Sequence, residues 1–455
     1  MSNESTERFS RRAYLKHATL AGTIAATGLA GCTSGSNSGS SNNGSGGGGD
    51  GGSNNGNSSG SGGQNALELV HWWTAGGEKQ ALNALLDGFK KKHPEVKIKN
   101  NPAPGGAGSA LAAAIKSRVL SDNPPSTFQI WPGEALSPYI ESDVLDDISD
   151  SVWTKEMQKA YLPGPRKLAK PSGNFVAVPL DIHRLNNLFY NVQVLKDAGI
   201  DPKSIENPSD LLSAMKTVEK KTDAVGLAQA TSQPWTTLQL WGTVFLSQVG
   251  AKTFMDFIAG NPEKYEKEIK EALTLLTKYK QHWNKDSASL TWDQANTKLI
   301  NGKAAFFHQG DWAAGQYEAT KGFEYKKDWN QVTFPGSSGI YSLVIDSFVM
   351  PKNNPSPEAT KKWLSYCGSI DGQKRFNPIK GSIPPRADVP MDSFGPFLKN
   401  QFDDFTSSNV QTPTIAHGLA VEPEIHSSMD EAFAAFSENW NVEEAYNGIV
   451  NAFDV

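Results

Sequence analysis

The chain has 455 residues, 38% of them apolar, and a formal net charge of −5. A chain of this length and composition can build more than one hydrophobic core, so we expect a globular protein of two domains. Lysine and arginine are not in excess and form no long run. This excludes the electrostatic footprint of a protein that binds nucleic acid or an anionic membrane surface. The composition does not exclude a small uncharged ligand.

Residues 1–31 are similar to a secretion signal. Ser10-Arg11-Arg12-Ala13-Tyr14-Leu15-Lys16 resembles a twin-arginine export motif, and the weakly apolar stretch from His17 to Gly31 is too short for a spanning helix. Leu29-Ala30-Gly31-Cys32 then resembles a lipobox, in which cleavage before Cys32 leaves a lipid on its thiol. The alternative is a disordered tail in which the arginine pair and the cysteine are accidental. We predict a twin-arginine signal peptide and a lipid-anchored protein on the extracellular face of the cell membrane.

Residues 32–65 are expected to form the lipidated cysteine and a tether. From Thr33 to Gln64 the chain is almost entirely Gly, Ser and Asn, which predicts a flexible coil with a reach of tens of Å. Once Cys32 carries the lipid, Cys367 is the only other cysteine, so no intrachain disulfide can form. The apolar surroundings of Cys367 in the sequence indicate a buried and inert thiol.

The folded part begins with an alternation of strands and helices. Strands are expected at residues 66–70, 96–99 and 127–131, with helices between them, and this βαβαβ order predicts a parallel sheet. In such sheets ligands bind outside the carboxyl ends of the strands. The residues expected at those ends are Trp72, Trp73, Gln129 and Trp131.

A polar crossing follows between two further strands. Residues 176–180 and 187–190 are expected to be strands, and Asp181-Ile182-His183-Arg184 joins them as a candidate hinge. From Gln193 onward the pattern is helical and alternates with short strands, which predicts a second α/β lobe.

The chain is expected to return to the first lobe near its C-terminal third. Residues 341–350 are predicted to form one strand with Asp346 at its middle. Helices are then expected at 357–368 and 371–376, followed by a turn at Asn377-Pro378-Ile379-Lys380-Gly381, where the chain crosses between lobes again. The last part is expected to be mostly helical.

Eight segments of the chain resemble one protein family. In chain order they are WWTAGGEKQAL, GGAGSALAAAIKSRVLSDNPPSTFQIW, VPLDIHRLNNLFYN, SLTWDQA, NGKAAFFHQGDWAAG, IDSFVMPK, NPIKGSIPPR and IAHGLAVEPE. They are similar to segments of the family 1 extracellular solute-binding proteins of carbohydrate ABC transporters, and most of all to the glucose/galactose type of monosaccharide-binding protein. The resemblance covers residues 66–455.

The resemblance implies an α/β, two-lobed periplasmic-binding-protein fold of the type II-like class. Its parallel-type sheets are flanked by helices, and its ligand cleft lies between lobes joined by several hinge crossings. The N-lobe is expected at 66–182 and 345–380, and the C-lobe at 183–344 and 381–455. The family implies a monomer that binds a sugar without catalysis, cofactor or metal. It also implies delivery to two permease subunits with a cytoplasmic ATPase, in which ligand shifts the population from open to closed lobes.

The resemblance also implies the ligand-binding residues. They combine flat aromatic faces with charged and amide groups, which suits the apolar C–H faces and the hydroxyl rim of a pyranose. They are Trp72, Trp73, Glu78, Gln129, Trp131, His183, Trp292, Asp311, Trp312, Asp346, Lys380 and His417. Trp131 departs from the family, because the glucose-type proteins have histidine there. Outside this set, core packing is the preferred interpretation of Trp235, and Asp181 is either a hinge ion pair or a contact.

Three alternatives remain open at this point. A disaccharide or oligosaccharide ligand is the nearest, because Trp131 could reshape the pocket. A secreted glycoside hydrolase is more distant, since tryptophan and carboxylate clefts also occur in those enzymes. A metalloenzyme is disfavoured, because the eight histidines are scattered and no HExxH motif occurs.

Overall fold

The computed structural model describes residues 65–74, 76–103 and 108–454. The predicted signal peptide, the lipid site at Cys32 and the tether up to residue 64 lie outside these described residues. Within them, no helix is both long enough and apolar enough to cross a membrane. Cys367 is a free and fully buried cysteine, as predicted, and burial raises the pKa of its thiol.

The first lobe is built on a five-stranded sheet in the order β2-β1-β3-β11-β4. Its strands are β1 (Ala66–His71), β2 (Lys97–Pro102), β3 (Thr127–Ile130), β4 (Ala177–Pro179) and β11 (Ser347–Val349). The first three strands are parallel, as predicted, whereas β11 runs antiparallel to β3 and β4. The predicted βαβαβ beginning is therefore confirmed, within a sheet that is mixed as a whole.

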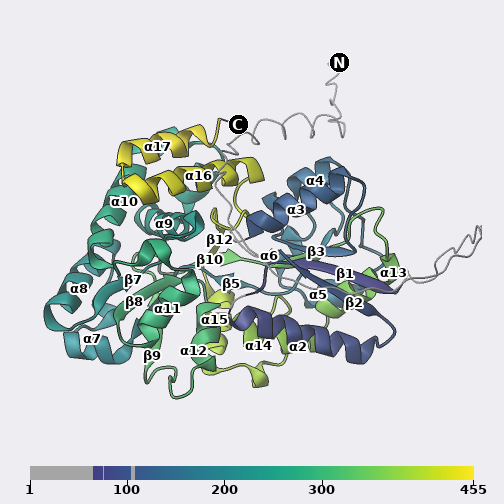
Figure 1. Ribbon diagram of the computed structural model, residues 1–455, viewed down its shortest axis with the longest axis horizontal. Coiled ribbons are helices and arrows are strands. Elements are labelled where there is room, and N and C mark those ends of the chain that lie inside the picture. The colour runs from purple at the N-terminus through teal and green to yellow at the C-terminus, as the bar shows by residue number, and fades with distance from the viewer. Residues whose placement is uncertain (1–64, 75, 104–107, 455) are drawn as a thin grey trace, which may run out of the picture. The chain divides into compact units, whose positions relative to one another are not determined.

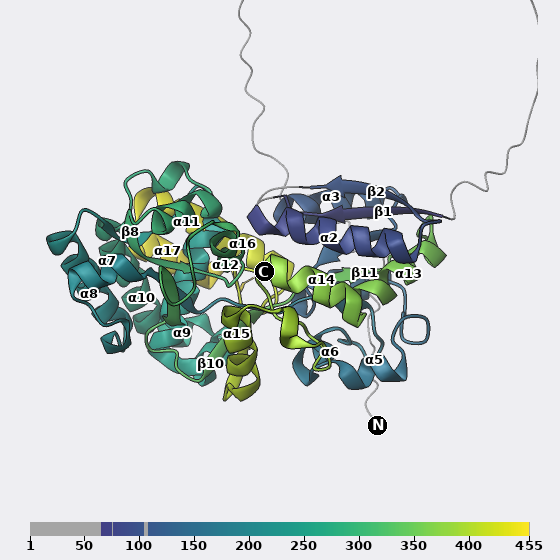
Figure 2. The same ribbon diagram turned by 90° about the horizontal axis from the view of Figure 1, so that it is seen from below.

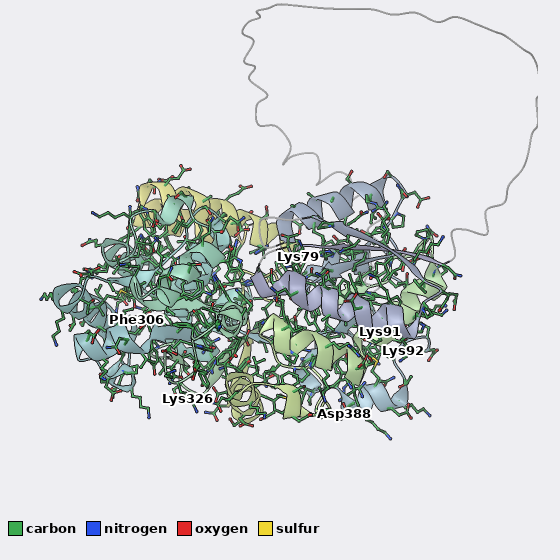
Figure 3. All side chains as sticks on the ribbon, turned by 60° about the horizontal axis from the view of Figure 1, so that its bottom comes forward. Lys79, Lys91, Lys92, Phe306, Lys326 and Asp388 are labelled. Atoms are coloured by element: carbon green, nitrogen blue, oxygen red, sulfur yellow. The ribbon has the colours of Figure 1, made fainter. Side chains whose placement is uncertain are left out.

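Helices α2 and α14 lie side by side in the first lobe (Figures 1 and 2). Leu82, Leu85 and Phe89 of α2 are buried at helical spacing, while Lys91 and Lys92 at its end point outward (Figure 3). The helices of this lobe are α2 (Gly76–Lys92), α3 (Ser109–Leu120), α4 (Ser137–Glu141), α5 (Lys155–Ala160), α6 (Pro163–Leu168), α13 (Pro357–Cys367) and α14 (Ile370–Lys380).

The second lobe has a four-stranded sheet in the order β7-β8-β6-β9. Its strands are β6 (Asn187–Asn191), β7 (Val225–Ala228), β8 (Ala304–Gln309) and β9 (Trp329–Thr333). Only β7 and β8 pair in parallel, because β6 runs antiparallel to both of its neighbours. Phe306 of β8 is fully buried in the core of this lobe (Figure 3).

Helices surround this second sheet. They are α7 (Val192–Ala198), α8 (Pro208–Lys221), α9 (Pro234–Ile258), α10 (Glu266–Tyr279), α11 (Trp292–Ile300), α12 (Ala313–Ala319), α15 (Pro396–Ser407), α16 (Pro423–Asn439) and α17 (Val442–Asn451). Helix α9 is kinked at Gly250, whose φ of 75° is outside the helical region. Helix α8 begins with a capping box between Asn207 and Asp210, which satisfies free backbone N–H groups.

A small third sheet contains the crossing segments between the lobes. Its strands are β5 (His183–Arg184), β10 (Ile340–Val344) and β12 (Val410–Pro413), in the order β12-β10-β5. The prediction of one strand over 341–350 was wrong, because β10 ends at Val344 and β11 begins at Ser347. The two halves pair in different sheets, so the chain must bend between them, and Asp346 lies in that bend.

The predicted turn at Asn377–Gly381 is the last turn of α14 and its C-cap. Pro378 lies inside this helix, where it removes one backbone donor, and the Asn377 side chain donates to the carbonyl of Gln373 at 3.0 Å. Gly381 ends the helix with a φ of 81°, and a Cβ there would lie 3.0 Å from the Asp311 carbonyl oxygen. Helix α14 therefore carries Lys380 in its last turn.

We propose that the two lobes have the limits predicted from the sequence. The strands of the first sheet fall within 66–182 and 345–380, and those of the second within 183–344. Residues 383–387, assigned to the second lobe, form backbone hydrogen bonds with residues 160–162 and with Ile182 of the first.

Candidate functional site

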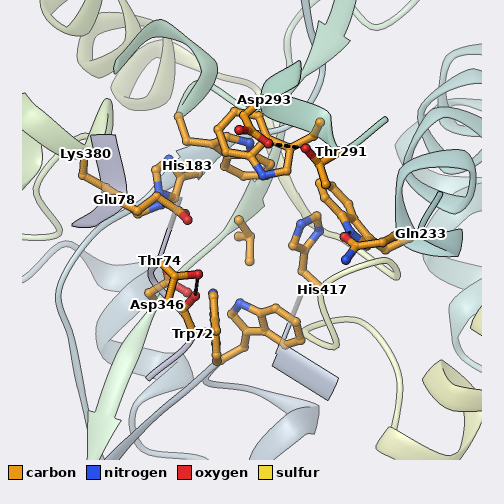
Figure 4. A pocket seen from close by; sticks show the side chains of 15 residues that line it. Trp72, Thr74, Glu78, His183, Gln233, Thr291, Asp293, Asp346, Lys380 and His417 are labelled. Atoms are coloured by element: carbon orange, nitrogen blue, oxygen red, sulfur yellow. Dashed lines mark hydrogen bonds and ion pairs between the residues drawn. The ribbon is translucent and has the colours of Figure 1, made fainter. Parts of the chain in front are cut away.

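A cavity of about 250 Å³ is lined by residues from both lobes and from the crossing segments (Figure 4). Its lining residues are Trp72, Thr74, Glu78, Trp131, His183, Gln233, Trp235, Thr291, Trp292, Asp293, Trp312, Val344, Asp346, Lys380 and His417. Glu78 and Lys380 lie on one side of the open centre, and Gln233 and His417 lie on the other (Figure 4). Aromatic and charged side chains thus face the same small space.

Aromatic rings form a connected wall of the cavity. The ring centroids of Trp72 and Trp131 are 5.0 Å apart, and Trp131 contacts His417 edge-on at 5.6 Å. Trp235 and Trp312 also contact His417, at 5.6 and 5.4 Å. Burial, with positive charges nearby, lowers the pKa of His417 well below its usual range, so this imidazole is neutral. The wall therefore offers uncharged, flat surfaces suited to apolar C–H groups.

A buried ion pair forms part of the opposite side. The Lys380 ammonium donates to Glu78 Oε1 at 2.8 Å, and only 2% of the lysine side chain is exposed. Burial disfavours the charged lysine, but the carboxylates of Glu78, Asp346 and Asp181 outweigh it and raise the pKa of Lys380. Glu78 lies in the first turn of α2 and Lys380 in the last turn of α14, positions that each helix dipole favours. Lys380 is therefore a fixed cation.

His183 lies between two carboxylates. Its Nδ1 hydrogen-bonds to Asp311, and its Nε2 is 3.4 Å from Asp181 Oδ2. Burial and Lys380 oppose protonation, but Asp311 and Asp181 outweigh them and raise the pKa of His183 to about 9. Asp311 also accepts the backbone N–H of Arg184 at 3.0 Å, which fixes its orientation. At neutral pH His183 is consequently an imidazolium at the edge of the cavity.

Asp346 is a buried carboxylate at the bend between β10 and β11. Its backbone N–H donates to Asp181 Oδ1 at 2.8 Å, and its own carbonyl accepts from the N–H of Leu180 at 2.9 Å. Burial and the Asp181 charge raise the pKa of Asp346 to about 7, against the opposing influence of Lys380 and His183. The site thus combines two cations with a carboxylate, Asp346, whose protonation is sensitive to pH.

The structure brings nine of the twelve predicted site residues to this cavity. They are Trp72, Glu78, Trp131, His183, Trp292, Trp312, Asp346, Lys380 and His417. Contact of any of them with a ligand stays a prediction. Asp181 forms the hinge interactions described above, which is one of the two roles left open for it.

The other three predicted residues support the lining from behind. Trp73 is 1% exposed and packs against Phe348 and Phe376 in the core. Gln129 is fully buried, and its Oε1 accepts the backbone N–H of Trp72 at 3.1 Å. Asp311 is fully buried behind His183. In this structure each of the three positions a neighbouring group and does not line the cavity.

Sequence reasoning did not select six of the lining residues. Thr74, Thr291, Asp293 and Val344 flank residues that were selected, so closeness to a candidate was the only signal. Gln233 and Trp235 lie at the start of α9, on either side of Pro234 at the first helical position. Core packing was preferred for Trp235, yet its ring both packs in the core and lines the cavity.

The sequence was then compared with known proteins. Residues 75–374 match the model of the bacterial extracellular solute-binding proteins. The chain belongs to this family. It is 41% identical over 459 residues to the xylose/arabinose-binding protein XacG of Haloferax volcanii, covering 99% of this chain and 98% of that protein. The family predicted from the sequence motifs is confirmed.

Solved structures show the same fold. The bacterial solute receptor AcbH, whose structural study reports an exclusive preference for β-D-galactopyranose, has a TM-score of 0.72 at 16% identity, covering 86% of this chain and 98% of that one. A chitin oligosaccharide binding protein has a TM-score of 0.73 at 16% identity, with the same coverage. The predicted two-lobed periplasmic-binding-protein fold is confirmed.

Proposed function

We propose that this protein captures one monosaccharide of the glucose-like type outside the cell and delivers it to an ABC importer. The observation that carries the proposal is a small cavity lined by both aromatic rings and fixed charges. Pockets for drug-sized ligands measure roughly 300–1,000 Å³, so a cavity of about 250 Å³ favours a ligand of one ring.

The lining supplies what a pyranose needs. Trp72, Trp131 and Trp312 offer stacking faces for its C–H groups, while Lys380 and His183 donate to its hydroxyl oxygens. Asp346 accepts from hydroxyl groups, as does any carboxylate with a free lone pair. Removing one charged partner from the closed site should cost about 2–3 kcal/mol, because the group left behind remains desolvated and unpaired.

The printed names of similar proteins support a sugar but leave its size open. XacG is named for xylose and arabinose and AcbH is described with galactopyranose, which are monosaccharides. The chitin oligosaccharide binding protein has the same fold. A disaccharide or oligosaccharide is therefore the alternative ligand, and the small cavity volume is the reason for preferring one ring.

The N-terminal motifs support a cell-surface location. In this proposal the chain is exported by the twin-arginine route, anchored through a lipid on Cys32, and held at the extracellular face of the membrane by the tether. A monomer presents both lobes to two permease subunits, and ligand shifts the lobes toward the closed state that those subunits bind. The cytoplasmic ATPase then drives import.

The proposed role involves no catalysis. A glycoside hydrolase is the distant alternative, because such enzymes also place two carboxylates beside a sugar. Here Glu78 is bound to Lys380, and Asp181 is held by the backbone of Asp346. Release of a chromophore from an aryl glycoside by the purified chain would establish hydrolysis in place of simple binding.

Intrinsic fluorescence tests the proposal directly, because five tryptophans line the cavity. The purified chain is titrated with glucose, galactose, xylose, arabinose, maltose and trehalose, and each responding sugar is measured by calorimetry. We expect saturable binding of at least one monosaccharide, and at least a thirtyfold weaker affinity in the Asp346→Ala variant, which corresponds to about 2 kcal/mol. Binding of disaccharides alone would favour the alternative, and no response to any sugar would contradict the proposal.

A further inference from the structure

Trp131 occupies an unusual position in the aromatic wall. It follows the last residue of β3, so it belongs to the first lobe, but its ring is packed against the C-terminal segment of the chain. Its side chain is buried, with 8% of the residue exposed, and its indole meets that of Trp72 at 57°. Trp131 therefore lines the cavity while it contacts elements that are distant in sequence.

Two glycines lie close to the indole. A Cβ built on Gly418 would lie 3.1 Å from Trp131 Cε3, and one built on Gly108 would lie 3.5 Å from Trp131 Cη2. The Gly108 Cβ would also lie 3.2 Å from the ring of Trp72. Both glycines have positive φ, 63° and 97°, so a side chain at either place would be strained as well as crowded. The indole fills the space that these glycines leave.

Two histidines also contact the ring. His417 meets the indole at 78° and His426 of α16 meets it at 87°, with centroid distances of 5.6 and 6.1 Å. Edge-on contacts of this kind are favourable beyond the area that they bury. His426 in turn lies 4.0 Å from Asp430 on the same helix. With contacts on these sides, the indole cannot rotate away from the cavity without displacing its neighbours.

We propose that Trp131, fixed by Gly108, Gly418, His417 and His426, is the end wall that restricts the site to one sugar ring. The inference rests on the proposed function. An indole has nine ring atoms and a pyranose has six, so removing the indole would add to the cavity a space comparable with a second sugar ring. Trp131 is thus the specificity-determining residue for ligand length, and His426 is a positioning residue that acts through it.

Calorimetry on the full chain tests this inference. Wild type and Trp131→Ala are titrated with xylose and xylobiose, and with glucose and maltose. In the wild type we expect each monosaccharide to bind at least 100-fold more tightly than its disaccharide. In Trp131→Ala we expect this ratio to fall at least tenfold, through tighter disaccharide binding and not only through weaker monosaccharide binding. His426→Ala should shift the ratio in the same direction by a smaller factor.

Trp292→Ala is the matched control, because Trp292 lines the same cavity without contacts to the two glycines. It should weaken monosaccharide binding without any gain for disaccharides. If Trp131→Ala fails to fold, as judged by circular dichroism, Trp131→Leu provides a smaller side chain at the same place and must show the gain. Equal gain in the Trp292 variant, or no gain in a folded Trp131 variant that still binds monosaccharide, would overturn the inference. A wild type that binds no sugar overturns the proposed function itself, and the inference with it.

Discussion

Because two carboxylates flank His183, the stability of this protein should decrease as the pH becomes alkaline. The pKa of His183 rises from 6.5 in the unfolded chain to about 9 in the folded one, because Asp311 and Asp181 outweigh burial and Lys380. A group whose pKa is raised by folding stabilises the folded state fully below its unfolded pKa. That contribution is lost as the pH rises through the folded pKa. We therefore expect the free energy of unfolding to fall between pH 6.5 and pH 9.5.

The magnitude follows from the size of the shift. At about 1.4 kcal/mol for each pH unit, a rise from 6.5 to about 9 corresponds to about 3 kcal/mol of stability. The variant Asp311→Asn keeps the shape of the side chain and removes its charge. Burial and Lys380 then act against Asp181 without the help of Asp311, so the pKa of His183 should fall. The variant should lose most of the pH dependence and be less stable than wild type at pH 6.5.

Urea denaturation at half-unit pH intervals from 6.5 to 9.5 measures this effect. Asp293→Asn is the control, since Asp293 lines the same cavity but its described side-chain partner is the Thr291 hydroxyl. It should keep the wild-type pH dependence. The pKa of Asp346 is raised to about 7, so this carboxyl titrates at a lower pH than His183. Its contribution to the pH dependence should be seen in wild type and in both variants. An Asp311→Asn variant with the full wild-type slope would refute the reasoning about His183.

Three further outcomes are expected. Lys380→Met should lower the free energy of unfolding in urea by about 3–5 kcal/mol, because it leaves the partly buried Glu78 without its partner. Lys79→Met, on the exposed side of α2, should have little effect. Sugar affinity measured by calorimetry should be about tenfold weaker at pH 6 than at pH 8, since Asp346 protonates near pH 7 and loses its charge as an acceptor; Asp346→Asn should abolish this dependence. Gly381→Ala should destabilise the protein by about 1–3 kcal/mol in thermal unfolding, because the φ of this residue is 81° and the added Cβ would crowd a backbone oxygen. Gly242→Ala is the control and should not destabilise the protein, because the space around Gly242 is open.

The main features of the fold could be predicted from local sequence patterns. The strands predicted at 66–70, 96–99 and 127–131 correspond to β1, β2 and β3, and the helix predicted between the first two corresponds to α2. The bend at Asp346 could not be predicted in this way, because each half of 341–350 has good strand sequence and the break arises from pairing in two different sheets. The helical turn at Pro378 was missed since proline usually ends a helix, whereas here α14 continues through Pro378 to Lys380.

The prediction of the candidate site from the sequence was also incomplete. Motif similarity selected residues near the cavity, but it could not separate a lining residue from one that lies behind it. Asp311 and Trp312 are adjacent in the sequence, yet only Trp312 lines the cavity, while Asp311 binds His183. Gln129 likewise holds the backbone of Trp72. This difference depends on side-chain direction at the end of a strand, which a pattern of residue types does not contain.

The two crossing segments that meet at Asp346 have a consequence for motion. Leu180 and Asp181 on one crossing segment form hydrogen bonds with Asp346 on the other. These bonds connect the two segments at the point where the lobes join. A rotation displaces least the atoms that lie nearest its axis. If the lobes rotate about this point, a ligand bound to Asp346 and His183, as proposed, would keep these contacts during the rotation. In the proposed function, the segment that joins the lobes would also be the segment that binds the sugar.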